Sequence, residues 1–271
     1  SSVSRRIRDL EAELKVELFH RSTRVVKLSA LGQVYYEQII EIVSALDNAD
    51  DFVSQHSKVP SGVIRITAMP SYGTLVLQPV LEKLRKLYPE IILDIELTDK
   101  VSDISQNEVD IAIRASSVLP ERAVARKLSD NRFLLIASPE YLEKNGVPTN
   151  TEELLNHRSL LYRGPNGILH WQARINDTWR ELKTNPVYIS NDGSALVKAA
   201  LSGQGIALLP EWGIANELKS GSLCKLIMED EDVSVTRVLH SGIYLLYLKP
   251  RYHILKIKAA VDFLVSELSL L

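Results

Sequence analysis

The sequence predicts an α/β protein in three parts: a short basic N-terminal domain, a long linker helix and two α/β subdomains. Three observations support this prediction. Apolar residues between positions 30 and 58 recur every three or four residues. After Gly62, segments typical of strands alternate with segments typical of helices. A very apolar strand and an amphipathic helix end the chain. We therefore expect an N-terminal domain at 1–32, a linker helix at 30–58 and a larger α/β domain at 62–271.

The first element is expected to be an amphipathic helix whose charges oppose the helix dipole. Its apolar residues fall on one face, at Val3, Ile7, Leu10 and Leu14. Three arginines precede three acids along it, whereas the dipole favours acids first. This order suits a helix that enters a DNA groove, because Arg grips phosphate and reads guanine. Charge order alone does not exclude a solvated amphipathic helix, since each dipole interaction contributes only about 0.3–1 kcal/mol.

A short basic hairpin is expected next. Residues 20–24 have the composition of a polar turn and residues 25–28 that of a returning strand, so Arg21, Arg24 and Lys27 gather near its tip. Up to Lys27 the chain has seven Lys and Arg against four Asp and Glu, a net charge of +3. The whole chain carries −2, so the remainder carries −5. Positive charge is thus concentrated where phosphate would be met.

One long helix is expected from residue 30 to about residue 57. Its apolar stripe is formed by Leu31, Tyr35, Ile39, Ile42, Leu46, Ala49 and Val53. Ser29 is placed to cap its start. The small N-terminal domain offers little core to cover the stripe. We therefore interpret the segment as a dimerisation helix, whose stripe packs against the same helix of a second chain. Packing on its own domain is the alternative.

The rest of the chain is predicted to form two linked α/β subdomains. Strands are expected at 63–68, 91–97, 109–114, 132–137, 159–162, 187–190, 206–209 and 243–248. Helices are expected at 75–88, 101–106, 139–145, 194–202, 211–219 and 254–268, and a hairpin around Asn176 and Asp177. The initial βαβαβ order predicts a mostly parallel sheet.

The chain is expected to cross between these subdomains twice. We place the first subdomain at 62–136 and 240–271, and the second at 137–239. Two crossings make a hinged pair with a cleft, and ligands of such sheets bind at the carboxyl ends of strands.

Eight short motifs occur in a specific order along the chain. The first three are V-S-R-x-I-R-x-L-E-x-E-L at 3–14, L-F-x-R at 18–21 and L-x-x-x-G at 28–32. The others are D-I-A-I-R at 110–114, A-R-K-L at 125–128, A-S-P-E-Y-L at 137–142, G-x-G-I-A-L-L-P at 203–210 and D-F-L at 262–264. Together they resemble the LysR-type transcriptional regulators. The resemblance implies a winged helix-turn-helix, here partial, a linker helix and an effector-binding domain similar in fold to periplasmic solute-binding proteins.

The resemblance also implies DNA-binding residues and an oligomer. We expect Ser2, Ser4, Arg5 and Arg8 to face the major groove, and Arg21, Arg24 and Lys27 to hold phosphates. The chain starts at the recognition helix, so we expect operator binding to need the family's preceding helices. Lys15 stands where the family usually has Gly, at a left-handed turn that should cost about 1 kcal/mol. A homodimer or homotetramer is expected.

Seven residues just past strand ends are candidates for effector binding: Ser71, Tyr72, Thr74, Thr98, Arg114, Asn191 and Ser194. Hydroxyls and free N–H groups at helix N-termini form anion sites. The set predicts an anionic or strongly hydrogen-bonding small molecule such as a carboxylate, although Asp192 argues against a simple anion at its corner. The alternative is structural: the hydroxyls can be ordinary helix caps, and Arg114 can pair with a nearby acid.

Composition argues against several other classes of protein. The single cysteine excludes a disulfide scaffold and suits the cytoplasm. No segment has the length of a membrane span, and the six histidines lack metal-ligand spacing. No nucleophile, base and orienting group can be assembled, so we expect neither an enzyme nor a cofactor. A solute-binding protein of a transport system is the alternative to a regulator, although it would need neither the basic hairpin nor the long helix.

Overall fold

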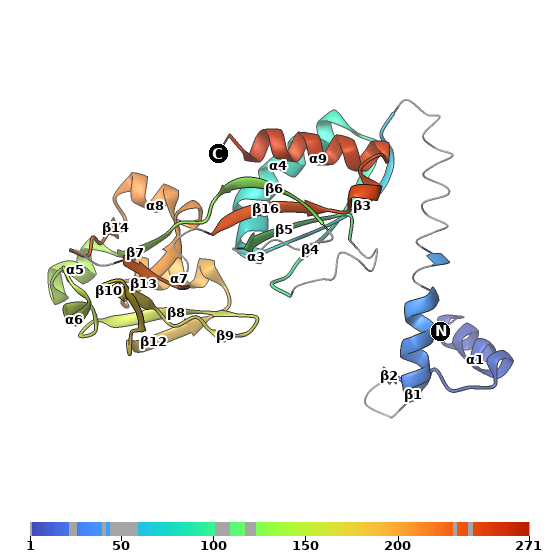
Figure 1. Cartoon of the computed structure of the whole chain (residues 1–271), viewed down its shortest axis with the longest axis horizontal. Coiled ribbons are helices and arrows are strands. Elements are labelled where there is room, and N and C mark those ends of the chain that lie inside the picture. The colour runs from blue at the N-terminus through green and yellow to red at the C-terminus, as the bar shows by residue number, and fades with distance from the viewer. Residues whose placement is uncertain are drawn as a thin grey trace. The chain divides into compact units, whose positions relative to one another are not determined.

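The computed structural model describes residues 2–21, 26–39, 42–43, 59–100, 109–116, 123–229, 232–237 and 241–270 (Figure 1). These residues fall into two compact units. The first contains the described residues up to 43, and the second contains those from 59 onward.

The N-terminal unit consists of a helix, a hairpin and the start of the linker helix. Helix α1 spans Ser2–Leu14, and strands β1 (Phe19–Arg21) and β2 (Val26–Leu28) pair antiparallel. A further helix is described over residues 30–39 and 42–43. The expected N-terminal helix and hairpin are confirmed. The remainder of the expected linker helix lies outside the described residues.

Two residues fix the junction between the hairpin and the linker helix. The buried Ser29 caps the helix, as expected: its Oγ accepts a hydrogen bond from the Gly32 N–H at 2.9 Å and donates to the Glu17 carbonyl at 2.6 Å. A Cβ at Gly32 would lie 2.0 Å from the Leu18 carbonyl oxygen, so only glycine permits this approach.

At the end of helix α1, Lys15 has a left-handed φ of 57°, which is the strained conformation expected there.

The first subdomain of the second unit is built on a five-stranded sheet with the order β4-β3-β5-β16-β6. Its strands are β3 (Gly62–Ala68), β4 (Ile91–Leu97), β5 (Ile111–Ser116), β6 (Val124–Asp130) and β16 (Gly242–Tyr247). Strand β3 pairs in parallel with β4 and β5, and β16 pairs antiparallel with β5 and β6. The parallel start is as predicted, whereas β6 was not predicted as a strand.

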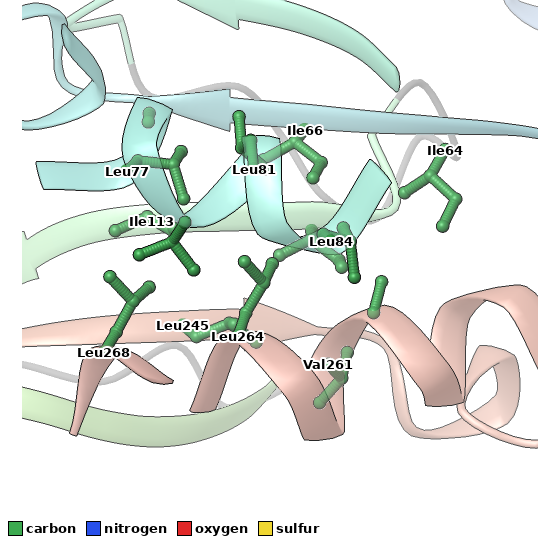
Figure 2. Packing of buried hydrophobic residues seen from close by; sticks show 14 of the residues in the cluster. Ile64, Ile66, Leu77, Leu81, Leu84, Ile113, Leu245, Val261, Leu264 and Leu268 are labelled. Atoms are coloured by element: carbon green, nitrogen blue, oxygen red, sulfur yellow. The ribbon is translucent and has the colours of Figure 1, made fainter. Parts of the chain in front are cut away.

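Two helices pack together over this sheet: α4 (Gln78–Leu87) and α9 (Leu255–Leu268). Figure 2 shows side chains of their shared core, which come from both helices and from three strands: Ile66, Leu81, Leu84, Ile113, Leu245, Val261 and Leu264. Burying one such side chain contributes about 1.5–3 kcal/mol, so this core fixes the sheet that carries the site.

The helix after β3 begins earlier than predicted. It runs through α3 (Pro70–Tyr72) and a π-helical turn η1 (Gly73–Leu77) into α4. The sequence predicted a start at residue 75, because apolar periodicity is visible only from there. Pro70 fixes a φ suited to the first helical position. Because π-turns are frequent at functional sites, this turn makes the segment around Ser71 a candidate functional site.

The second subdomain is built on a sheet with the order β12-β8-β13-β7-β14, in which β9 pairs with β8. Its strands are β7 (Phe133–Ala137), β8 (Arg158–Gly164), β9 (Gly167–Ile168), β12 (Asn185–Ser190), β13 (Ile206–Pro210) and β14 (Cys224–Lys225). Strands β12, β8 and β13 are parallel, and β7 and β14 are antiparallel to their neighbours. Its helices are α5 (Pro139–Asn145), α6 (Thr151–Leu154), α7 (Gly193–Leu201) and α8 (Ala215–Ser220). Short 3₁₀ turns are η3 (Glu211–Gly213) and, in the first subdomain, η4 (Lys249–Arg251).

A small third sheet contains the predicted hairpin. Its strands are β10 (Gln172–Ile175), β11 (Thr178–Glu181) and β15 (Asp232–Ser234). Asn176 and Asp177 connect β10 to β11 with φ values of 48° and 61°. Two successive positive φ values characterise the tight turns that match strand twist. The hairpin prediction is therefore confirmed.

Strand β7 corrects the boundary that was expected between residues 136 and 137. All of Phe133–Ala137 pairs within the second sheet, so the first crossing precedes β7. An apolar strand can join either sheet, and its sequence does not specify its partners. The return crossing near residue 240 and the helix expected at 101–106 fall outside the described residues.

Candidate functional site: a cavity between the subdomains

A cavity of about 910 Å³ is lined by both subdomains of the second unit. The first subdomain contributes the segments that follow β3 and β4 and the residues that end β5. The second contributes β8, the loop after it, α7, β13 and the segment 212–217 that follows β13. Polar lining residues include Ser71, Asp99, Arg114, Tyr162, Ser194 and Lys198. This is the carboxyl edge of the parallel strands, where the α/β architecture predicts a ligand.

Arg114 places a guanidinium group on the cavity wall. Its Nη2 donates to Thr67 Oγ1 at 2.7 Å and to the Lys100 carbonyl at 3.3 Å, and its Nη1 donates to a neighbouring backbone carbonyl at 2.9 Å. Burial lowers the pKa of Arg114, and the carboxylates of Asp99 and Glu96 act in the opposite direction. Among the described residues, no carboxylate forms an ion pair with this guanidinium. Its charge is therefore held in place by neutral acceptors, as suits recognition of an anion.

A hydrogen bond joins the two subdomains beside Arg114. The Tyr162 hydroxyl, on β8, donates to Asp99 Oδ2 at 2.7 Å, and Asp99 follows β4 in the first subdomain. Burial raises the pKa of Tyr162, and the hydrogen bond to Asp99 raises it further. The tyrosine therefore remains a neutral donor, and the pair links the two subdomains at the cavity wall.

A second contact across the cavity involves Ser71 and Gly193. A Cβ at Gly193 would lie 2.9 Å from Ser71 Oγ, so the two segments meet only because residue 193 has no side chain. Gly193 is the first residue of α7, and Asp192 caps that helix by accepting from the Ser194 N–H at 2.9 Å. The N-cap positions are Met69 for α3 and Asp192 for α7, so neither Ser71 nor Ser194 caps the helix near whose start it lies. The alternative that these two hydroxyls are ordinary helix caps is therefore excluded.

Three of the seven predicted effector-binding residues line the cavity: Ser71, Arg114 and Ser194. The other four do not. Tyr72 is a core residue, 2% exposed, whose ring meets that of Trp212 edge-on at 5.1 Å between centroids.

The remaining three predicted residues are directed elsewhere. Thr74 and Asn191 are exposed outside the lining, and Thr98 Oγ1 accepts from the Lys100 N–H at 3.2 Å. Successive residues of a helix or turn point in different directions, so proximity in sequence to a strand end did not ensure proximity to the cavity.

Sequence reasoning missed Asp99, Tyr162 and Trp212, which also line the cavity. Asp99 is adjacent to the predicted Thr98, and Tyr162 ends a predicted strand, so both carried the strand-end signal that was used elsewhere. Trp212 Nε1 donates to Asn131 Oδ1 at 3.0 Å. Nothing in the sequence indicated that pairing, because 81 positions separate the two residues.

The N-terminal unit presents several of the predicted DNA-binding residues. Ser4, Arg5 and Arg8 are exposed on α1, and Lys27 is exposed on β2. Arg8 Nε donates to the Ser4 carbonyl at 3.3 Å. Ser2 begins α1 and Arg21 ends β1, but nothing is described of their side chains, and Arg24 lies outside the described residues.

Glu11 connects helix α1 to the hairpin, which the sequence did not predict. Its Oε1 accepts from the backbone N–H groups of Leu18 and Phe19, both at 3.0 Å. The carboxylate therefore fixes the start of β1 relative to α1. On the same helix, Val3 is 62% exposed and Leu14 39%, so part of the predicted apolar stripe is uncovered within this unit.

Two negative findings concern the described part of the chain. None of its helices has the length and apolarity needed to cross a membrane. Its His, Cys, Asp and Glu side chains form no group that could hold a metal ion.

Two family profiles match the chain. The profile described as "LysR substrate binding domain" matches residues 57–269, and "Bacterial regulatory helix-turn-helix protein, lysR family" matches residues 1–33. The second match covers helix α1 and the hairpin, and the first covers nearly all of the unit that contains the cavity.

Curated relatives carry related descriptions. The HTH-type transcriptional activator TtdR of Escherichia coli K12 is 32% identical over 267 residues, which cover 97% of this chain and 83% of TtdR. The HTH-type transcriptional regulator CrgA of Neisseria meningitidis serogroup B is 32% identical over 269 residues, covering 99% and 88% respectively.

Solved structures show the same fold. The structure of CrgA, a LysR-type transcriptional regulator from Neisseria meningitidis, matches with a TM-score of 0.68 and 30% identity, covering 98% of this chain and 89% of CrgA. The full-length Vibrio cholerae virulence activator AphB matches with a TM-score of 0.71, covering 98% and 89%. Its identity is 24%, so that likeness concerns the fold alone.

Proposed function

This chain belongs to the LysR family of bacterial transcriptional regulators, and we propose that its cavity binds the effector through a carboxylate held at Arg114. One observation carries this proposal: a guanidinium fixed by three neutral acceptors lies on the wall of the cavity between the subdomains. Charge-assisted bonds from Arg to a carboxylate are about twice as strong as neutral ones. Ser71 and Ser194 supply hydroxyls from opposite subdomains.

Effector binding would act on the closure of the two subdomains. A ligand that bonds to Ser71 and Ser194 at once interacts with the closed arrangement more strongly than with an open one. It therefore shifts the population toward closure. In an oligomer paired through the linker helix, a change in closure alters the spacing of the DNA-binding units. The Tyr162–Asp99 hydrogen bond joins the two subdomains, so closure favours this bond and opening breaks it.

DNA recognition is assigned to the N-terminal unit. Ser2, Ser4, Arg5 and Arg8 would face the major groove, and Arg21, Arg24 and Lys27 would hold phosphates. The exposure of Ser4, Arg5, Arg8 and Lys27 supports this assignment. We further propose that the protein works in the cytoplasm as a homodimer or homotetramer, without catalytic activity. A solute-binding role is not favoured, because the helix-turn-helix profile matches residues 1–33.

A thermal-shift screen tests the effector site. The chain is heated with small carboxylates, amino acids and aromatic acids. A ligand at one hundred times its Kd should add about 2.7 kcal/mol to stability. Arg114→Gln should abolish the shift. Arg132→Gln, which removes an exposed arginine outside the cavity, should leave it intact. Equal loss in both variants, or no loss in Arg114→Gln, would contradict the assignment.

A gel-shift titration tests the DNA-binding residues in the intact regulator. Arg5→Ala should weaken operator binding by about 1–3 kcal/mol if Arg5 reads a base. Lys27→Ala should weaken binding to all sequences about equally and reduce the salt dependence. If Arg5→Ala also weakened binding uniformly, Arg5 would be a phosphate contact instead.

A further inference from the structure

The cavity is larger than a carboxylate at Arg114 requires. Its volume of about 910 Å³ lies near the upper end of the roughly 300–1,000 Å³ typical of sites for drug-sized ligands. A small acid bound at Arg114 would leave most of this space to water. The shape and chemistry of the remaining lining therefore indicate what else the ligand carries.

One face of helix α7 lines the cavity along almost its whole length. Ser194, Val197, Lys198 and Leu201 recur at the spacing of a single helix face. The helix rises about 10 Å from Ser194 to Leu201, about the extended length of an octyl chain. This face has two polar residues: Ser194, at the end where Gly193 meets Ser71 in the first subdomain, and Lys198, one turn further along.

The lining beyond that polar end is mostly apolar. Val197 packs against the apolar cluster that contains the buried Ile214, and Ile214 also lines the cavity. Leu75 from the first subdomain and Leu201 from the second line the same cavity, yet they are 48% and 37% exposed. Where such a leucine faces the cavity, an apolar ligand group that covers it removes apolar surface from water. The Arg114 guanidinium together with the apolar Val197 and Leu201 along the helix matches a ligand with an anionic head and an apolar body. Lys198, on the same face, is exposed, so its apolar stem can lie along the wall while its ammonium group stays in water.

We propose that the effector is an amphipathic monoanion, a medium-chain carboxylate of about eight carbons. This inference depends on the proposed carboxylate site at Arg114. The head group bonds to Arg114, Ser71 and Ser194, and the chain lies along Val197 and Leu201. Short polar acids fill only the head-group end, so the apolar wall selects against them.

Calorimetric titration of the chain with butyrate, hexanoate, octanoate and decanoate tests the inference. The Kd should fall by roughly fourfold for each added CH₂ up to octanoate and then level off. Octanol and octylamine, which keep the chain but not the anion, should bind at least tenfold more weakly. A Kd independent of chain length would overturn the inference while leaving the carboxylate site intact. Absence of binding by every carboxylate would overturn both.

A matched pair of leucine variants localises the chain. Leu201→Asn changes a partly exposed residue, so the fold should survive, and it should weaken octanoate binding roughly five- to tenfold without changing butyrate binding. Leu270→Asn removes a leucine that is 82% exposed and outside the lining, and it should change neither. Equal effects of the two variants, or an equal loss of butyrate and octanoate in Leu201→Asn, would contradict the placement of the chain along α7.

Discussion

Replacing Gly193 with alanine should loosen the closed cavity without destabilising the protein. Gly193 begins α7 and its φ is not positive, so alanine suits its backbone. By restricting the unfolded chain, alanine should add about 0.4–1 kcal/mol to stability. Its Cβ, however, would lie 2.9 Å from Ser71 Oγ, about half an ångström closer than ordinary contact. The substitution therefore separates the stability of the fold from closure of the cavity.

The overlap sets the magnitude of this effect. Overpacking of this kind costs about 1–3 kcal/mol, at the low end if the Ser71 hydroxyl rotates away. The ratio of closed to open molecules should then fall roughly fivefold to 150-fold. Amide hydrogen exchange followed by mass spectrometry reports it: peptides covering 69–77 and 191–201 should exchange faster. Urea unfolding should show equal or greater stability.

A second substitution provides the control. Ser71→Ala removes the hydroxyl, and the remaining Cβ of residue 71 lies 3.5 Å from the new Cβ, which is ordinary contact. The double variant Ser71→Ala/Gly193→Ala should therefore exchange like the wild type. Wild-type exchange in Gly193→Ala alone would show that the two segments do not pack as described. A double variant as open as the single one would refute the steric explanation.

Three further predictions concern other parts of the molecule. Burial raises the pKa of Tyr72 from 10.0 to about 12, so the folded state holds this proton more tightly. The contribution of Tyr72 to the free energy of unfolding should be constant below pH 10 and fall by up to about 2.7 kcal/mol between pH 10 and 12, so urea unfolding of Tyr72→Phe should lose less stability over this range than the wild type. Glu11→Ala should lower the free energy of unfolding of the N-terminal unit by about 2 kcal/mol and speed amide exchange at residues 18 and 19, because it removes the acceptor of both N–H groups. Glu11→Gln keeps an acceptor and should cost less, and equal exchange rates in the two variants would contradict the role of Glu11 in fixing β1. Arg251 Nη2 lies 2.6 Å from Oδ1 of the buried Asp110. Arg251→Met should therefore lower the free energy of unfolding by about 3–5 kcal/mol in urea titrations, because it leaves the Asp110 charge buried without a partner, and the double variant Asp110→Asn/Arg251→Met should recover part of that loss because it removes the charge.

Local patterns were sufficient to place most elements. The stripe at Val3, Ile7, Leu10 and Leu14 predicted helix α1, which spans Ser2–Leu14. Asn176 and Asp177 predicted a hairpin because these residue types tolerate positive φ. Such signals depend only on residues close in sequence, so the chain displays them directly.

The same patterns did not show which strands pair. Strand β7 was placed with the wrong sheet, and β6 was not predicted, because sheet partners are set by residues far apart in sequence. The start at Pro70 was missed for a different reason. The segment 70–77 contains a π-turn, which breaks the regular helical period on which the prediction relied.

The sequence by itself determined the kind of protein: its motifs, its basic N-terminal domain and its alternating strands and helices predicted a LysR-type regulator. It also predicted three residues that line the cavity, Ser71, Arg114 and Ser194, because strand ends and helix starts are readable locally. Only the tertiary structure decided which neighbours face the cavity. It buries Tyr72 in the core, and it joins Asp99 to Tyr162 across 63 positions. The physical reason is that a binding site is made where side chains from distant segments converge, and that convergence follows from how the two subdomains pack.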